Sequence, residues 1–154
     1  MRPIEISVRR AVVDDVEAIA PLFDAYRRFY EMPADLMLAR EYLRARLAAS
    51  ESIIFIAQDN GGNAVGFCQL YPTFCSVLAR RQFVLYDLFV APSARRTGSG
   101  KALLLAAEQY ALEQGAARME LQTAKTNLGA QSLYEECGWI RDEVFFVYSK
   151  VIPK

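Results

Sequence analysis

The sequence predicts an α/β protein with three layers, in which one mixed sheet carries helices on both faces. Segments of strand and helix character follow each other in the order strand, two helices, three strands, helix, strand, helix and two strands. The strand at residues 82–90 is apolar on both faces, which is typical of the centre of a covered sheet. The chain of 154 residues, 53% of them hydrophobic, suffices for the core of one domain over residues 1–154.

The chain begins with a strand and two helices. Residues 6–11 form the strand, and Asp14 with Glu17 makes a capping box for a helix that ends near residue 30. Pro33 interrupts this helix, because proline cannot donate the helical hydrogen bond. A second helix spans residues 35–49.

A hairpin and a long strand follow. Residues 52–58 and 64–71 are strands, and the polar, glycine-rich segment 59–63 between them predicts the hairpin turn. Residues 72–81 are expected to be a loop or short helix, and residues 82–90 the central strand.

The second half adds two helices, each ended by a glycine, and three strands. The expected segments are the helix 98–114, the strand 118–123, the helix 127–137, and the strands 139–142 and 145–150. The central sheet therefore has six to seven strands, flanked by four helices.

The composition excludes several classes of function. Lys plus Arg and Asp plus Glu both number 18, so the basic excess typical of nucleic-acid binding is absent. The chain has no histidine, which excludes a Ser/His/Asp triad and a histidine-ligated metal, and no metal is expected. No segment reads as a signal peptide or a membrane span, so we expect a cytoplasmic protein without membrane partners.

The most informative segment connects the central strand to the third helix. Gly98 and Gly100 open that helix, and Arg95, Arg96 and Lys101 lie around them. The first peptide N–H groups of a helix lack partners and carry a partial positive charge, and glycine lets a phosphate approach them. The segment therefore predicts a phosphate or pyrophosphate site.

Two nucleotide motifs fail at this segment. A nucleoside-triphosphate P-loop needs glycine at Arg95 and a hydroxyl residue at Ala102. A dinucleotide fingerprint needs a third glycine at Leu103. The remaining pattern is Arg-x-x-Gly-x-Gly behind a strand that ends in Val-x-Pro.

A second motif follows about thirty residues later. Asn127, Ala130 and Tyr134 lie on one face of the fourth helix, which is followed by Gly138 and Trp139. The two motifs in this order resemble the signatures of the GNAT superfamily of acyl-CoA N-acyltransferases, from about residue 64 to the C-terminus. The resemblance implies the GNAT fold and acetyl-CoA as co-substrate. The small Ser99 and the indole of Trp139 depart from the usual residues without affecting the backbone cradle.

The resemblance also implies roles for individual residues. The strand before the turn would offer main-chain groups to the pantetheine arm and the acetyl carbonyl, and the turn would hold the pyrophosphate. The implied cofactor-binding residues are Leu88, Phe89, Val90, Arg95, Arg96, Thr97, Gly98, Ser99, Gly100, Lys101, Asn127 and Tyr134.

Tyr134 and Asp87 are the expected catalytic residues. Tyr134 would protonate the leaving thiolate; the alternative is a tyrosine of the core. Strict strand alternation places Asp87 on one face with Phe83, Leu85 and Phe89. A carboxylate among apolar groups is either a structural partner or a site residue that binds the acceptor amine and accepts its proton.

The acceptor is less defined. Asp87, Tyr30 and Glu120 are the expected substrate-binding residues, with Glu120 as the alternative base and helix packing as the alternative role of Tyr30. The acidic residue before the cofactor strand resembles the polyamine acetyltransferase branch, which implies a small cationic amine. Alternatives are a protein or amino-acid acceptor, or a module that binds acyl-CoA without turnover. The apolar C-terminal segment 144–151 predicts a homodimer.

Overall fold

The computed structural model describes residues 4–154, which divide into two compact units, one that ends at Gln122 and one that spans Thr123–Lys154. The first unit contains a five-stranded sheet in the order β1-β2-β3-β4-β5, with antiparallel neighbours except for the parallel pair β4 and β5. The elements of the chain are β1 (Ser7–Arg10), η1 (Val13–Asp15), α1 (Val16–Phe29), α2 (Leu36–Ala48), β2 (Ile53–Gln58), β3 (Ala64–Cys75), β4 (Arg80–Val90), η2 (Pro92–Ala94), α3 (Ser99–Glu113), β5 (Arg118–Glu120) and α4 (Leu128–Glu136).

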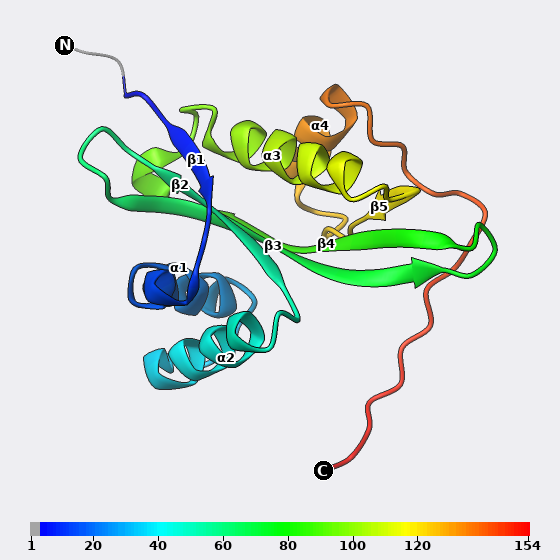
Figure 1. Cartoon of the computed structure of the whole chain (residues 1–154), viewed down its shortest axis with the longest axis horizontal. Helices are drawn as coiled ribbons and strands as arrows, with labels where there is room; N and C mark the ends of the chain where they lie inside the picture. The colour runs from blue at the N-terminus through cyan, green and yellow to red at the C-terminus, as the bar shows by residue number, and fades with distance from the viewer. Residues whose placement is uncertain (1–3) are drawn as a thin grey trace. The chain divides into compact units, whose positions relative to one another are not determined.

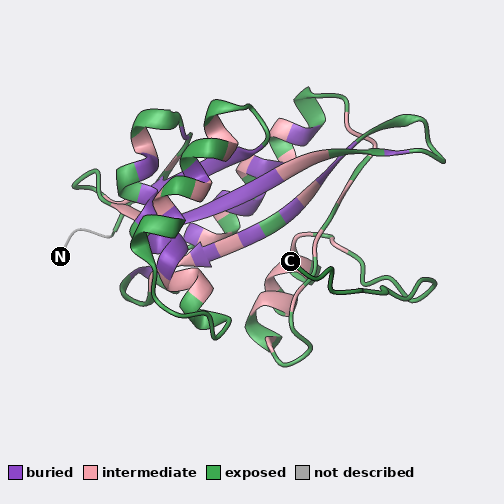
Figure 2. Ribbon diagram, turned by 90° about the horizontal axis from the view of Figure 1, so that it is seen from below, coloured by how far each residue is buried: buried purple, intermediate pink, exposed green. Residues whose placement is uncertain are grey.

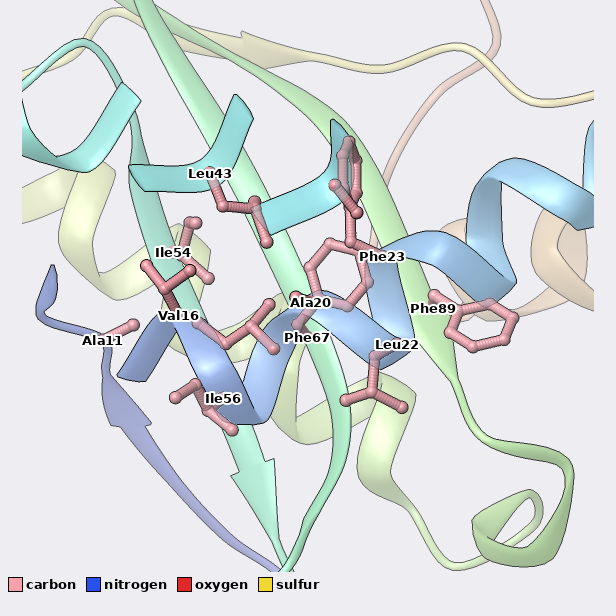
Figure 3. Close-up of a cluster of buried hydrophobic side chains, with 12 residues drawn as sticks. Ala11, Val16, Ala20, Leu22, Phe23, Leu43, Ile54, Ile56, Phe67 and Phe89 are labelled. Carbon is pink, nitrogen blue, oxygen red and sulfur yellow. The ribbon is translucent and has the colours of Figure 1, made fainter. Parts of the chain in front are cut away.

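The expected layers of the first unit are confirmed. Helices α1 and α2 cover one face of the sheet and α3 covers the other (Figure 1). On the first face, apolar side chains of both helices meet those of β2, β3 and β4 in one cluster (Figure 3). Phe23 of α1 and Phe67 of β3 lie at its centre with their ring centroids 6.1 Å apart. This packing fixes α1 and α2 against the strands that carry the site.

Local details at the start of α1 differ from the expected capping box. Asp15, rather than Asp14, stabilises this end, because its carboxylate accepts a hydrogen bond from the Val12 N–H at 2.7 Å and pairs with Arg9 at 2.7 Å. Glu17 pairs instead with arginines of α2 at 3.0 and 3.2 Å.

Residues 72–81 are not a loop. β3 and β4 extend into a long antiparallel hairpin in which Cys75 pairs with Arg80. In the hairpin, the backbone N–H and C=O groups of these residues pair across the ladder, whereas in a surface loop they would bond to water.

Among the described residues the sheet has five strands instead of the expected six to seven, because residues 139–142 and 145–150 form no strand. Residues 139–154 instead run without a ladder partner in the second unit, whose helix α4 is confirmed. A strand needs a neighbouring strand to pair its backbone groups, and none of the described residues serves as that neighbour. Among residues 4–154, no helix combines the length and the apolar character needed to span a membrane.

Candidate active site

The strand β4 contains a bulge next to Asp87, the residue expected to bind the acceptor. Gln69 of β3 pairs with Asp87, whereas the next residue, Leu70, pairs with Leu85. Tyr86 is therefore an extra residue on β4, and such a bulge bends a strand and redirects its side chains.

The bulge changes which residues of β4 share a face. Phe83 packs on Tyr110 of α3 with ring centroids 5.5 Å apart, whereas Phe89 packs on Tyr26 of α1 at 6.2 Å. The expectation that Asp87 shares a face with Phe83 is therefore wrong, because the extra residue interrupts the alternation. Asp87 and Phe89 share the face covered by α1 and α2.

Asp87 is a buried carboxylate with two polar neighbours. Its side chain is 5% exposed, and its Oδ2 accepts a hydrogen bond from Nε2 of Gln69 at 2.8 Å. Burial raises the pKa of Asp87, and hydrogen bonds from Gln69 and Tyr26 oppose this effect. The Oε1 atom of Gln69 is buried without a hydrogen-bond partner among the described residues. The pair therefore combines a carboxylate that holds its proton more strongly than usual with an unused acceptor.

Tyrosines from four elements are linked to this carboxylate, either directly or through one another. The hydroxyl of Tyr26 also donates to the carbonyl oxygen of Tyr86 at 3.3 Å. The Tyr71 ring lies 5.5 Å from the Tyr86 ring, and its hydroxyl shares a 2.6 Å hydrogen bond with that of Tyr42. Burial, this hydrogen bond and the charge of Asp87 raise the pKa of Tyr71, so Tyr71 stays neutral at physiological pH. Aromatic faces beside a carboxylate suit an ammonium group.

The sequence indicated Asp87 but missed Gln69, Tyr26 and Tyr71 as its neighbours. A polar Gln69 within the apolar run of β3 was the available signal. The expected acceptor residue Tyr30 is 48% exposed and contacts the Tyr26 ring, with centroids 5.1 Å apart. Glu120 lies on β5 in an exposed ion pair with Arg118, 3.1 Å apart, and has no bond to this group among the interactions described.

β4 and β5 pair over only a short stretch. Gln82, Phe83 and Val84 pair with Arg118–Glu120, and β4 then continues to Val90 beyond the end of this ladder. The second half of β4 thus has β3 on one side and no strand on the other among the described residues.

The main chain of β4 turns some of its groups towards this open side. The Ala91 N–H donates to the Val65 carbonyl at 2.8 Å, which fixes the phase of the antiparallel ladder. Because ladder hydrogen bonds recur every second residue, the main-chain groups of Leu88 and Val90 face away from β3. The Val90 carbonyl accepts from Nε of Arg95 at 3.2 Å. The Leu88 N–H is thereby directed to the side where β4 has no paired strand.

The turn before α3 has the geometry of an anion cradle. Gly98 is the N-cap of α3 and has a φ of 84°, in the left-handed region that favours glycine. A Cβ atom at this position would meet no protein atom within 4 Å. Arg96 also has a positive φ, 62°, which is uncommon for a residue with a side chain. Such conformations often occur at ligand sites.

Hydrogen bonds hold the turn in this form. The Thr97 hydroxyl donates to the Ala94 carbonyl at 2.5 Å and lies 2.6 Å from the buried Ser99 hydroxyl. The Ala102 N–H donates to the Gly98 carbonyl at 2.9 Å as the first turn of α3 closes. The peptide N–H groups of Ser99 and Gly100 precede this bond and lie where a helix offers donors to an anion. Because position 99 is buried, a small side chain such as serine suits it.

In the second unit, Asn127 is the N-cap of α4, and Tyr134 lies within this helix. Oδ1 of Asn127 caps this helix by accepting from the Ala130 N–H at 3.2 Å, and the Nδ2 of the same side chain is a donor for a cofactor. The Tyr134 side chain is half-buried, with its ring centroid 6.2 Å from that of Trp139. Their positions seven residues apart place Asn127 and Tyr134 on one face of the helix.

The comparison with protein families decides the assignment. The model of the Acetyltransferase (GNAT) family matches residues 19–139. The chain belongs to the GNAT acetyltransferase family. It is an N-acetyltransferase of a family that uses acetyl-CoA.

Individual relatives agree with this assignment. The chain is 47% identical to the uncharacterized N-acetyltransferase YhfO of Bacillus subtilis (strain 168) over 96% of its own length and 99% of that protein. A crystal structure of a probable acetyltransferase has a TM-score of 0.90 and 37% identity, covering 96% of this chain and 99% of the other. An L-ornithine N5-acetyltransferase of Arabidopsis thaliana is 36% identical, over 47% of this chain and 32% of that protein.

Proposed function

We propose that this GNAT enzyme, acting as one catalytic domain over residues 1–154, transfers the acetyl group of acetyl-CoA to a small cationic primary amine. The observation that carries the proposal is the buried Asp87 among tyrosines on the bulged strand β4. The same strand leads through Val90 into the turn that opens α3. One strand thus connects an ammonium-binding side with an anion-binding turn.

The turn residues suit the pyrophosphate of acetyl-CoA. The open left-handed Gly98 leaves room for a phosphate, and the N–H groups of Ser99 and Gly100 can donate to it. Arg96 and Lys101 are exposed and add positive charge. In this proposal, Leu88, Phe89 and Val90 hold the pantetheine arm, and Arg95, Thr97 and Asn127 complete the set inferred from the resemblance.

The acceptor must lose a proton before it reacts. An alkyl ammonium with a pKa near 10.4 is neutral in only about one in two thousand molecules at pH 7. Asp87 offers the charge that binds the ammonium, and its raised pKa favours acceptance of a proton, directly or through a water. The unpartnered Oε1 of Gln69 gives the ammonium a second acceptor.

The remaining steps follow from the chemistry of acyl transfer. The neutral amine nitrogen bonds to the thioester carbonyl carbon and releases one proton to solvent. The C–S bond breaks, and the sulfur leaves with a proton that solvent returns to its donor. We assign the Leu88 N–H to the developing oxyanion because it points away from β3, and Tyr134 to the proton donated to sulfur. The support for Tyr134 is its place in the motif of α4.

A small acceptor is also favoured by one relative. The L-ornithine N5-acetyltransferase is named for an acceptor that carries an amine, and it shares 36% identity over 73 residues. Tyr30 would lie at the acceptor side, next to Tyr26. An amino acid or a protein amine remains the alternative acceptor within the enzyme class.

The test is a panel of polyamines, diamines, amino acids and peptides with acetyl-CoA, read by thiol release. We expect turnover with small diamines or polyamines. With these acceptors, Asp87→Asn should lower kcat/KM by about 10²- to 10⁴-fold, whereas the matched variant Glu120→Gln should change kcat/KM little. Turnover restricted to peptides would contradict the acceptor class, and retention of amine kinetics in Asp87→Asn would contradict the site.

A further inference from the structure

Gln69 occupies one of the most deeply buried positions of the sheet. The residue is 0% exposed, as are its neighbours on β3, Phe67, Cys68 and Leu70. Figure 2 shows the strands in the middle of the sheet as buried. A polar side chain at such a position loses its hydrogen bonds to water and needs replacements for them. Both ends of the Gln69 amide therefore require partners.

The side chain of Gln69 lies on the face of the sheet that α1 and α2 cover. Side chains alternate along β3, so Phe67, Gln69 and Tyr71 share one face. Phe67 packs on Phe23 of α1, with ring centroids 6.1 Å apart. The hydroxyl of Tyr71 shares a hydrogen bond of 2.6 Å with that of Tyr42 of α2. Gln69 thus lies on the face that we propose receives the acceptor.

The hydrogen bond to Asp87 fixes the orientation of the Gln69 amide. An ionised carboxylate only accepts hydrogen bonds, so the amide nitrogen, which only donates, is the atom that lies 2.8 Å from Oδ2 of Asp87. The amide oxygen is held at the other end of the group, where Oε1 is buried without a hydrogen-bond partner among residues 4–154. Gln69 therefore offers a buried acceptor to a ligand that donates.

An attacking primary amine needs two acceptors. Its neutral nitrogen has one lone pair, which is directed at the thioester carbonyl carbon, and two N–H groups, which point elsewhere. In a site closed to water, each N–H group needs an acceptor in the protein. The carboxylate of Asp87 supplies one such acceptor, and Oε1 of Gln69 supplies a second.

We propose that Gln69 determines the specificity of the acceptor site, because its Oε1 accepts the second N–H of a primary amine and rejects N-methylated amines. The inference rests on the proposed function and adds a residue that distinguishes between classes of amine. N-methylation replaces one N–H group by a methyl group, so one of the two buried acceptors has no donor when the nitrogen attacks. A buried acceptor left unpaired in this way should lower kcat/KM by about 10- to 100-fold.

The test compares two diamines of equal charge, putrescine and N,N′-dimethylputrescine, as acceptors for the full chain, read by thiol release. In the wild type, kcat/KM for putrescine should be about 10- to 100-fold higher. Gln69→Met retains the length of the side chain but lacks the amide oxygen, and it should lower this ratio by about 10-fold or more. Loss of the amide N–H that holds Asp87 affects both diamines, so the ratio reports on Oε1 alone.

The matched control is Gln82→Met. Gln82 is also buried, 6% exposed, but it lies at the start of β4, where its Oε1 accepts from Nε of Arg118 at 3.0 Å. This variant should keep the wild-type ratio. A wild-type ratio near one, or an unchanged ratio in Gln69→Met, would overturn the inference while the loss of activity in Asp87→Asn still supports the proposed function. Turnover of neither diamine would remove both.

A second measurement uses the unaltered protein and does not depend on whether a variant folds. At saturating putrescine, the side-chain amide resonances of Gln69 should shift in the ¹⁵N-correlated NMR spectrum, and those of Gln82 should not. Unshifted Gln69 resonances would show that the amine does not reach this amide, which would also overturn the inference.

Discussion

Replacement of Gly98 by alanine isolates the anion cradle from the rest of the fold. Gly98 adopts a φ of 84° at the N-cap of α3, and an added Cβ atom meets no protein atom within 4 Å. The cost to folding is therefore the left-handed backbone alone, about 1–2 kcal/mol. For a chain of this size, each kcal/mol lowers Tm by about 2–4 °C, so a decrease of about 2–8 °C is expected.

The chain contains a matched control in Gly62. This glycine has a φ of 79°, and a Cβ atom there also meets nothing within 4 Å, but it lies in the turn between β2 and β3. Gly62→Ala should therefore lower Tm by a similar amount. The two variants differ in whether the new methyl group lies in the turn that we propose binds a phosphate.

Isothermal titration with coenzyme A separates the two effects. If the methyl group costs one charge-assisted hydrogen bond, worth about 1.5–3 kcal/mol, Kd should rise about 10- to 150-fold in Gly98→Ala. Gly62→Ala should bind like the wild type. Equal coenzyme A affinity in two folded variants would refute the position of the pyrophosphate.

Three further predictions concern titratable groups. Burial raises the pKa of Asp87 in the folded state, so the free energy of unfolding of the wild type should decrease as the pH rises from the ordinary carboxyl pKa of 3.8 through the raised value. Urea unfolding at pH 4 to 8 should show this decrease for the wild type and not for Asp87→Asn. The same pH dependence in both proteins would contradict the burial argument. Tyr134→Phe should lower kcat by about 10²-fold or more with the coenzyme A Kd unchanged, and unchanged turnover would remove its role as acid. Burial raises the pKa of Cys68 to about 12. Iodoacetamide at pH 8 should therefore alkylate the half-buried Cys137 first and Cys68 only after unfolding, as measured by mass spectrometry. Early labelling of Cys68 would contradict this order and indicate local opening of β3.

The sequence predicted the parts of the site that depend on local backbone geometry. The strand, turn and helix around Gly98 and the helix α4 each lie within one short segment, and the structure forms them as expected. The left-handed Gly98 was foreseeable because the turn before a helix favours glycine.

The parts that depend on distant partners were missed. The bulge at Tyr86 arises from the register of β4 against β3, which the alternation of β4 alone does not encode. The environment of Asp87 likewise combines Gln69 from β3 with Tyr26 from α1. The last two expected strands were wrong for the same reason, since an apolar extended segment becomes a strand only where an edge receives it.

The most direct measurement of the central claim is an NMR titration of the ¹⁵N-labelled chain with coenzyme A. A phosphate bound at the start of α3 should shift the amide resonances of Gly98, Ser99 and Gly100 more than any others of the first unit. The amides of Gly61 and Gly62, in the hairpin between β2 and β3, should not move. Saturable binding that leaves the α3 turn unperturbed would contradict the claim.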